Sequence, residues 1–288
     1  MKNYLLKYSF FIFWAAIYPQ LSHYSIPKSF DNDLMDIISI FKTDELNVDQ
    51  LYAEDIADKK NGRPYRFGYS FPVDLDFFEF ATCDTLHNGD KVYRLQIESN
   101  DAYSINMIFN HFFLSEGSEL FIYNKDYSDI IGAFTSKNNK PYNRFSTTPI
   151  SGDIVLIEYY EPKLSKSNSI INISNIINGY KDVFRGYEDS EECNNNVNCP
   201  EFQSWNDEIS SVVLTLTDGG TRLCSGAMIN NVNQDLALYF LTSETCLGGH
   251  EDWIFMFNYE SPGCNNQDGI TNQTISGATL LSHHYESD

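Results

Sequence analysis

The residues best suited to chemistry lie between two cysteines near the C-terminus. Cys224 opens the run Cys-Ser-Gly-Ala-Met-Ile-Asn-Asn, and an apolar run ends in Thr245-Cys246. A hydroxyl group becomes a nucleophile when a neighbouring base takes its proton, and a threonine hydroxyl such as that of Thr245 cannot accept and return a proton near neutral pH. The histidines that could act as the base in place of Thr245 are His250, His283 and His284. A histidine on another strand or loop would rarely hold the geometry of a base, so we expect solvated surface histidines.

Composition limits the classes of protein to consider. The chain has 288 residues, which suggests two domains, and 42% of them are apolar, as in globular proteins. The net charge of −21 excludes nucleic acid as a partner, because little basic surface exists to neutralise phosphates. The acidity is typical of a soluble extracellular surface.

The N-terminus predicts export. Lys2 and Lys7 precede an apolar run from Tyr8 to Tyr18, which has the length of a secretory signal and is too short to span a bilayer. We assign residues 1–25 to a signal peptide, with an uncleaved membrane anchor as the alternative. An oxidising location fits the six cysteines; free thiols in a reducing cytoplasm are the other reading.

Residues 26–65 are assigned to a linker with a short amphipathic helix. The apolar residues at helical spacing after Asp33 are Leu34, Ile37, Ile38 and Phe41.

Residues 66–180 predict a β-sandwich, because short alternating runs are separated by turn signals. The expected strands are Lys91 to Glu98, Tyr103 to Phe109, Glu119 to Tyr123 and Asp153 to Tyr160, with Ile170 to Ile177 as a possible edge strand. We find no metal cluster, nucleophile–base pair or phosphate loop in this sequence, and predict neither a metal nor a cofactor.

Residues 181–198 form the predicted hinge, where Lys181 and Arg185 are possible processing sites, although lone basic residues in linkers usually have no such role. Residues 199–288 return to a strand pattern typical of one antiparallel barrel of about six strands. The expected strands are Ser210 to Thr217, Thr221 to Ile229, Leu236 to Thr242 and Trp253 to Tyr259, with the last strands starting near Leu280. Asp218-Gly-Gly is a hairpin signal between the first two.

Five stretches in order resemble secreted trypsin-like serine proteases of the lysyl-endopeptidase type. They are Cys193-Asn-Asn-Asn-Val-Asn-Cys199-Pro, Cys224-Ser-Gly-Ala-Met-Ile-Asn-Asn, Tyr239-Phe-Leu-Thr, Phe257-Asn-Tyr-Glu-Ser-Pro-Gly-Cys264 and Ser287-Asp288. Gly117-Ser-Glu-Leu-Phe-Ile-Tyr is similar to the region that leads such proteases.

The resemblance implies an all-β fold, with a β-sandwich leader followed by the first barrel of a chymotrypsin-like protease. It places the orienting carboxylate at Asp288 and the family's histidine at Thr245, and the nucleophile would lie further on. The family cleaves protein or peptide substrates. The residues that set the Lys versus Arg preference would also lie in the second barrel, beyond this sequence.

The resemblance also implies two disulfides, Cys224 with Cys246 and Cys199 with Cys264. Cys193 would bond to the second half of the protease, and Cys83 has no counterpart. A Cys83–Cys193 bond is possible without support from the family.

We therefore expect the N-terminal part of a secreted lysyl-endopeptidase-like precursor, truncated within the first barrel and inactive as it stands. Its exposed barrel face could associate with another surface. The main alternative is a secreted, non-catalytic β-sandwich protein for binding or adhesion, since aromatic surfaces suit recognition. A third is an inhibitor or chaperone-like pro-region.

Overall fold

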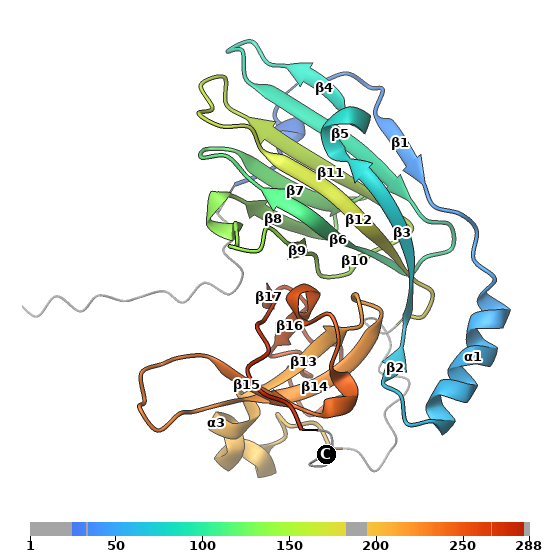
Figure 1. Ribbon diagram of the computed structural model, residues 1–288, viewed down its shortest axis with the longest axis vertical. Helices are drawn as coiled ribbons and strands as arrows, with labels where there is room; N and C mark the ends of the chain where they lie inside the picture. The colour runs from blue at the N-terminus through green and yellow to red at the C-terminus, as the bar shows by residue number, and fades with distance from the viewer. Residues whose placement is uncertain (1–24, 33, 183–194, 266, 285–288) are drawn as a thin grey trace, which may run out of the picture.

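The fold is all-β, as predicted. The computed structural model describes residues 25–32, 34–182, 195–265 and 267–284, and Figure 1 shows a two-layered β-sandwich above a separate C-terminal sheet. The described helices are short apart from α1. They are η1 (Lys28–Phe30), α1 (Val48–Lys60), α2 (Phe77–Phe80), η2 (Ser136–Asn138), η4 (Pro200–Trp205), α3 (Asn206–Ile209), η5 (Glu244–Cys246) and η6 (His250–Asp252). No described helix has the length and apolarity needed to cross a bilayer.

Two sheets make the sandwich. The first has the order β1 (Ser39–Lys42), β5 (Lys91–Glu98), β11 (Ile154–Glu161), β7 (Glu119–Asn124) and β8 (Ile130–Phe134), with β4 (Thr82–Thr85) also on β5. The second has the order β10 (Ile150–Ser151), β6 (Ser104–Phe113), β12 (Ile170–Gly179) and β3 (Gly68–Asp76), with β9 (Phe145–Ser146) also on β6. Alternate side chains of both sheets face inward and bury one shared apolar core.

The strands predicted at 91–98, 103–109, 119–123 and 153–160 are confirmed as β5, β6, β7 and β11. The edge position predicted for 170–177 is wrong, because β12 lies between β6 and β3. Ile171, Ile173 and Ile176 of β12 are buried in the shared core. The apolar side chains of this run therefore belong to an inner strand, where both backbone edges are paired.

The amphipathic helix predicted at 34–41 is also wrong. Residues 39–42 form β1, which pairs in parallel with β5. Ile37 is exposed, while Ile38 and Phe41 pack on two different clusters of the sandwich, so no continuous apolar stripe forms. The helix of this region is α1, in the part treated as linker.

Local signals explain why α1 begins and ends where it does. The Asn47 side chain caps its start by accepting a hydrogen bond from the Gln50 amide at 3.1 Å. Lys59 and Lys60 stand in the last turn, where positive charge favours the carbonyl end of a helix. These signals could have located the helix in the sequence.

The C-terminal sheet contains five strands from the region predicted to form the barrel. Their order is β15 (Tyr239–Thr242), β14 (Arg222–Ile229), β13 (Val212–Thr217), β16 (Ile254–Phe257) and β17 (Thr274–Ser276). Within the described residues no pairing joins the two edge strands β15 and β17, which is consistent with the predicted incomplete barrel. The last described strand is β17, so the expectation of a strand from Leu280 is wrong for residues 280–284.

The predicted hairpin is confirmed between β13 and β14. Asp218, Gly219 and Gly220 have φ values of 49°, 65° and 74°, the left-handed region that glycine and aspartate tolerate best.

A sixth strand reaches this sheet from the sandwich side. β2 (Tyr65–Arg66) pairs with β14, with Arg66 opposite Arg222 and Tyr65 opposite Leu223. The next residue, Phe67, is fully buried against Leu216, Ile254 and Met256. The backbone then continues into β3, so one segment of chain ties the two parts together.

Candidate functional site

The region that resembles a protease is held together by a disulfide. Cys224 on β14 is bonded to Cys246 in η5, as predicted. Cys246 is buried in a cluster with Val213, Trp253 and Phe255. The disulfide therefore fixes the turn that carries Thr245 to the middle of the C-terminal sheet.

The second predicted disulfide, between Cys199 and Cys264, is also present. It joins the segment that enters the C-terminal sheet to the loop after β16. Cys83 is an exposed free thiol, and Cys193 lies outside the described residues. The possible Cys83–Cys193 bond stays untested.

Thr245 lies at the surface, in the turn after β15. Ser243 caps the turn: its hydroxyl accepts a hydrogen bond from the Thr245 amide at 3.3 Å and lies 2.8 Å from the Thr245 hydroxyl. This local network holds a hydroxyl where the resemblance places an imidazole. The turn can orient groups by hydrogen bonding, but Thr245 supplies no base.

His283 comes near this turn. His283 Nδ1 lies 3.4 Å from Glu244 Oε1, next to Thr245, although the two residues are far apart in sequence. His250 lies in η6, and His284 is exposed in the final described segment. Asp288, the predicted orienting carboxylate, lies outside the described residues.

Comparison with known families gives a match in this region. Residues 187–288 match the family model of the lysyl endopeptidase C-terminal domain. This segment is similar to the lysyl endopeptidases. The match covers β13 to β17 of the C-terminal sheet, Thr245 and both disulfides. A relationship to lysyl endopeptidases and two disulfides fit an extracellular protein. The signal peptide at 1–25 stays a prediction, because residues 1–24 are not described.

The sandwich and the C-terminal sheet also meet through polar contacts. Arg144 makes a two-pronged ion pair with Asp252 of η6, with Nε donating to Oδ1 at 2.8 Å. Lys140 Nζ donates to the Ser276 hydroxyl at 2.8 Å and to the Ser276 carbonyl. Burial lowers the pKa of Lys140 to about 8.

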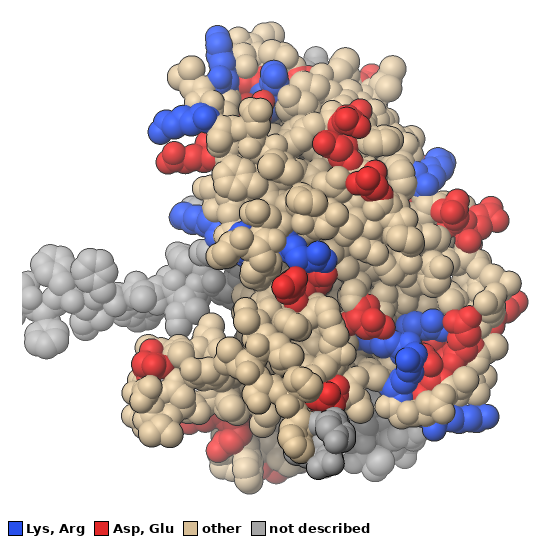
Figure 2. All heavy atoms as spheres, in the orientation of Figure 1, with Lys and Arg blue, Asp and Glu red and all other residues tan. Residues whose placement is uncertain are grey.

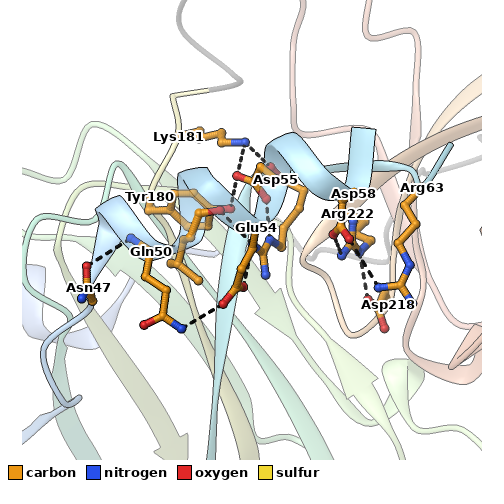
Figure 3. Close-up of polar contacts among 12 residues, drawn as sticks. Asn47, Gln50, Glu54, Asp55, Asp58, Arg63, Tyr180, Lys181, Asp218 and Arg222 are labelled. Carbon is orange, nitrogen blue, oxygen red and sulfur yellow. Dashed lines mark hydrogen bonds and ion pairs between the residues drawn. The ribbon is translucent and has the colours of Figure 1, made fainter. Parts of the chain in front are cut away.

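A second group of charges lies under α1, at the same junction. Figure 2 shows basic and acidic side chains gathered over the side where Figure 1 places α1. Asp55 accepts hydrogen bonds from Arg66 Nε and Tyr180 Oη, both at 2.7 Å, and its Oδ2 lies 2.6 Å from Lys181 Nζ. One carboxylate therefore contacts three groups at the sandwich end of the junction (Figure 3).

Asp58 makes the corresponding contact with the C-terminal sheet. Its Oδ2 accepts a hydrogen bond from Arg222 Nη2 at 2.5 Å, and Arg63 lies 3.6 Å from its other oxygen. Arg222 also donates to Asp218 Oδ2 at 3.1 Å, within the β13–β14 hairpin (Figure 3). Sequence analysis missed this group, because no spacing pattern connects residues so far apart in the chain.

Lys181, the possible processing site, belongs to this group. Its Nζ donates to the Arg66 carbonyl at 2.8 Å and lies 4.4 Å from the centre of the Tyr65 ring. A processing protease would have to extract this side chain from its contacts before cleaving after it. Arg185, the other possible site, lies outside the described residues.

The contacts of α1 are expected to weaken in acid. Burial alone would raise the pKa of Asp55, but hydrogen bonds from Lys181, Tyr180 and Arg66 outweigh it and hold the pKa below its ordinary value of 3.8. The hydrogen bond from Arg222 lowers the pKa of Asp58 in the same way. A carboxylate whose pKa is depressed by folding stabilises the fold above its unfolded pKa, and that contribution is lost as pH falls through the folded value.

The measurement compares the free energy of unfolding of the wild type and of Asp55→Asn/Asp58→Asn between neutral pH and about pH 3. We expect the wild type to be the more stable at neutral pH and the gap to close below about pH 4. Asp49→Asn, on the same helix, is the control and should follow the wild type. A gap that stays constant across this range would contradict the assignment.

Proposed function

We propose that this chain is the N-terminal part of a secreted lysyl-endopeptidase-like precursor whose protease-like sheet does not hydrolyse peptide bonds. The observation that carries the proposal is Thr245, which directly precedes Cys246 of the disulfide to β14. In the related proteases this position belongs to the histidine that activates the serine. The relationship of residues 187–288 to lysyl endopeptidases supports the comparison.

The chemistry follows from the side chain at this position. A serine hydroxyl becomes a nucleophile when a neighbouring imidazole removes its proton, and the same imidazole then protonates the leaving amine. Threonine can do neither near neutral pH, and general acid–base catalysis contributes about 10²–10⁴-fold in rate. Asp288 would have no imidazole at position 245 to orient.

His283 pairs with Glu244, an acidic residue beside Thr245. A histidine that hydrogen-bonds a carboxylate is oriented as catalytic imidazoles are. In this proposal the pair is a surface contact, because the His283 side chain is largely exposed. The assay below separates the two roles.

The test is hydrolysis of lysine and arginine esters and amides by the secreted full chain. We expect no turnover above the buffer rate, and the same result for Thr245→Ala. Turnover that a serine-directed inhibitor abolishes would contradict the proposal. If such turnover were found, its loss in His283→Gln and persistence in His284→Gln would identify His283 as the base.

The second candidate function is binding or adhesion through the sandwich. The observation that favours it is the buried core of the sandwich, which is made by residues of its two sheets and includes none from the C-terminal sheet. Screening the full chain against peptides and glycans tests it, and failure to bind any of them would count against it.

The predicted association through the barrel face remains a proposal as well. Large apolar side chains stand exposed along the β14–β15 hairpin: Ile229, Val232, Leu236, Leu238 and Leu241. Exposed apolar groups of this kind favour contact with another surface.

A further inference from the structure

Three basic side chains from separate segments converge at the junction of the sandwich and the C-terminal sheet. They are Arg66 of β2, Lys181 after β12 and Arg222 of β14, and their side chains are 14%, 12% and 9% exposed. Cations this shielded from water are costly unless an anion is paired with them. These cations are shielded with α1 in place, so any segment that covers the junction in this way must bring carboxylates.

In this structure α1 supplies it. Glu54, Asp55 and Asp58 occupy positions i, i+1 and i+4, so one side of the helix presents all three carboxylates (Figure 3). Glu54 and Asp55 share Arg66, at 3.1 Å and 2.7 Å, and Asp58 takes Arg222. The carboxylates of α1 therefore match the basic side chains of the junction in charge and in spacing.

Apolar burial contributes little to the attachment of α1. Among the thirteen residues of the helix, all of them described, Leu51 alone is buried. Tyr52 and Ile56 stay exposed, although the Tyr52 ring meets the Tyr180 ring edge-on. A helix that buries one apolar side chain is attached mainly through its ion pairs, and its attachment therefore depends on the charges at the junction.

We propose that this junction is a receptor site for an acidic helix, which the chain fills with its own α1. The partner chemistry is a helical peptide with carboxylates at i, i+1 and i+4. An occupied site couples the two parts of the chain, because Asp55 holds the sandwich end and Asp58 holds the β13–β14 hairpin. An acidic helix supplied from outside can replace α1 when the carboxylates of α1 are removed.

The experiment uses the full chain carrying Asp55→Asn/Asp58→Asn, which removes the two carboxylates that hold Lys181 and Arg222, leaves Glu54 on Arg66, and does not shorten the helix. The probe is a fluorescent synthetic peptide of residues 45–62, followed by anisotropy. We expect this variant to bind the peptide at least about ten-fold more tightly than the wild type, whose site is filled. Raising the salt to about 0.5 M should weaken binding by a similar factor.

Matched controls isolate the carboxylates. The full chain carrying Asp49→Asn should bind the peptide as weakly as the wild type does. A peptide carrying Asp49→Asn should bind the double variant as tightly as the unmodified peptide does. A peptide with Asp55→Asn/Asp58→Asn should lose binding by about ten-fold or more. Equal binding of the two peptides, or no binding to a folded double variant, overturns the proposal.

Hydrogen exchange in the wild type tests whether α1 detaches from the junction while the rest of the chain stays folded. The α1 amides should exchange at least about ten-fold faster than those of β13, through opening of the helix alone. An α1 that exchanges as slowly as β13 would overturn the proposal even if the double variant failed to fold.

Discussion

Replacing Phe67 by alanine is expected to lower the free energy of unfolding by about 3–5 kcal/mol, the usual cost of emptying a phenylalanine site in a core. Phe67 is fully buried, and its ring packs on Leu216, Ile254 and Met256 of the C-terminal sheet. Its amide donates to the Thr221 carbonyl at 2.9 Å, which fixes the backbone against the β13–β14 hairpin. The ring therefore fills the core of one part of the molecule from a strand that leads into the other.

The same substitution should also uncouple the two parts. Urea unfolding followed by circular dichroism and by tryptophan fluorescence is expected to give coincident transitions in the wild type. The described tryptophans, Trp205 and the buried Trp253, both lie in the C-terminal part. In Phe67→Ala the fluorescence transition should move to lower urea than the transition of the sandwich. Phe80→Ala is the matched control, because Phe80 is exposed on the sandwich, and it should cost less than about 1 kcal/mol. A smaller decrease in the free energy of unfolding for Phe67→Ala than for Phe80→Ala would contradict this account.

The strands that the sequence predicted could be recognised from their own residues. The run 91–98 alternates between more and less buried residues, and this periodicity is visible without knowledge of its partners. The run 153–160 was found by its apolar and aromatic residues, and its strand β11 is buried on both faces from Val155 to Tyr159. The hairpin at Asp218-Gly-Gly could also be predicted from its own residues, because its turn needs positive φ values that glycine and aspartate tolerate.

The elements that the sequence missed depend on distant partners. β2 is two residues long and exists because β14 offers it an edge. Residues 39–42 became a strand because β5 could accept them in parallel, while their apolar spacing indicated a helix. The disulfides were predicted through the resemblance alone, since six cysteines allow many pairings.

The junction shows why the candidate site could be predicted only in part. Thr245 was identifiable because it adjoins Cys246 within a recognisable stretch. The ion pairs of α1 join residues 54–58 to Arg66, Lys181 and Arg222, and they follow from the path of the chain through both sheets. The composition did not predict these ion pairs. It shows only that this acidic chain has few basic residues with which an acidic segment can pair.

The disulfides are expected to differ in what they contribute. In the chain-entropy account, a bridge stabilises the folded state by restricting the unfolded chain, and more so for a longer loop. Cys199 and Cys264 are 65 residues apart, and Cys224 and Cys246 are 22 apart. Removing the first bridge with alanines should cost roughly 4 kcal/mol and removing the second roughly 3 kcal/mol.

The second bridge should nevertheless have the larger local effect. Cys246 anchors the turn that carries Thr245 in the cluster of Trp253 and Phe255, so hydrogen exchange in residues 243–247 should rise more in Cys224→Ala/Cys246→Ala than in Cys199→Ala/Cys264→Ala. Cys83→Ala is the control, because it removes an exposed free thiol and no bridge, and it should stay within about 0.5 kcal/mol of the wild type. Thermal and urea unfolding of the three variants measure the comparison. If removing either bridge cost no more than Cys83→Ala, these bridges would not be what holds the protease-like sheet in shape, and its packing alone would have to position the turn at Thr245.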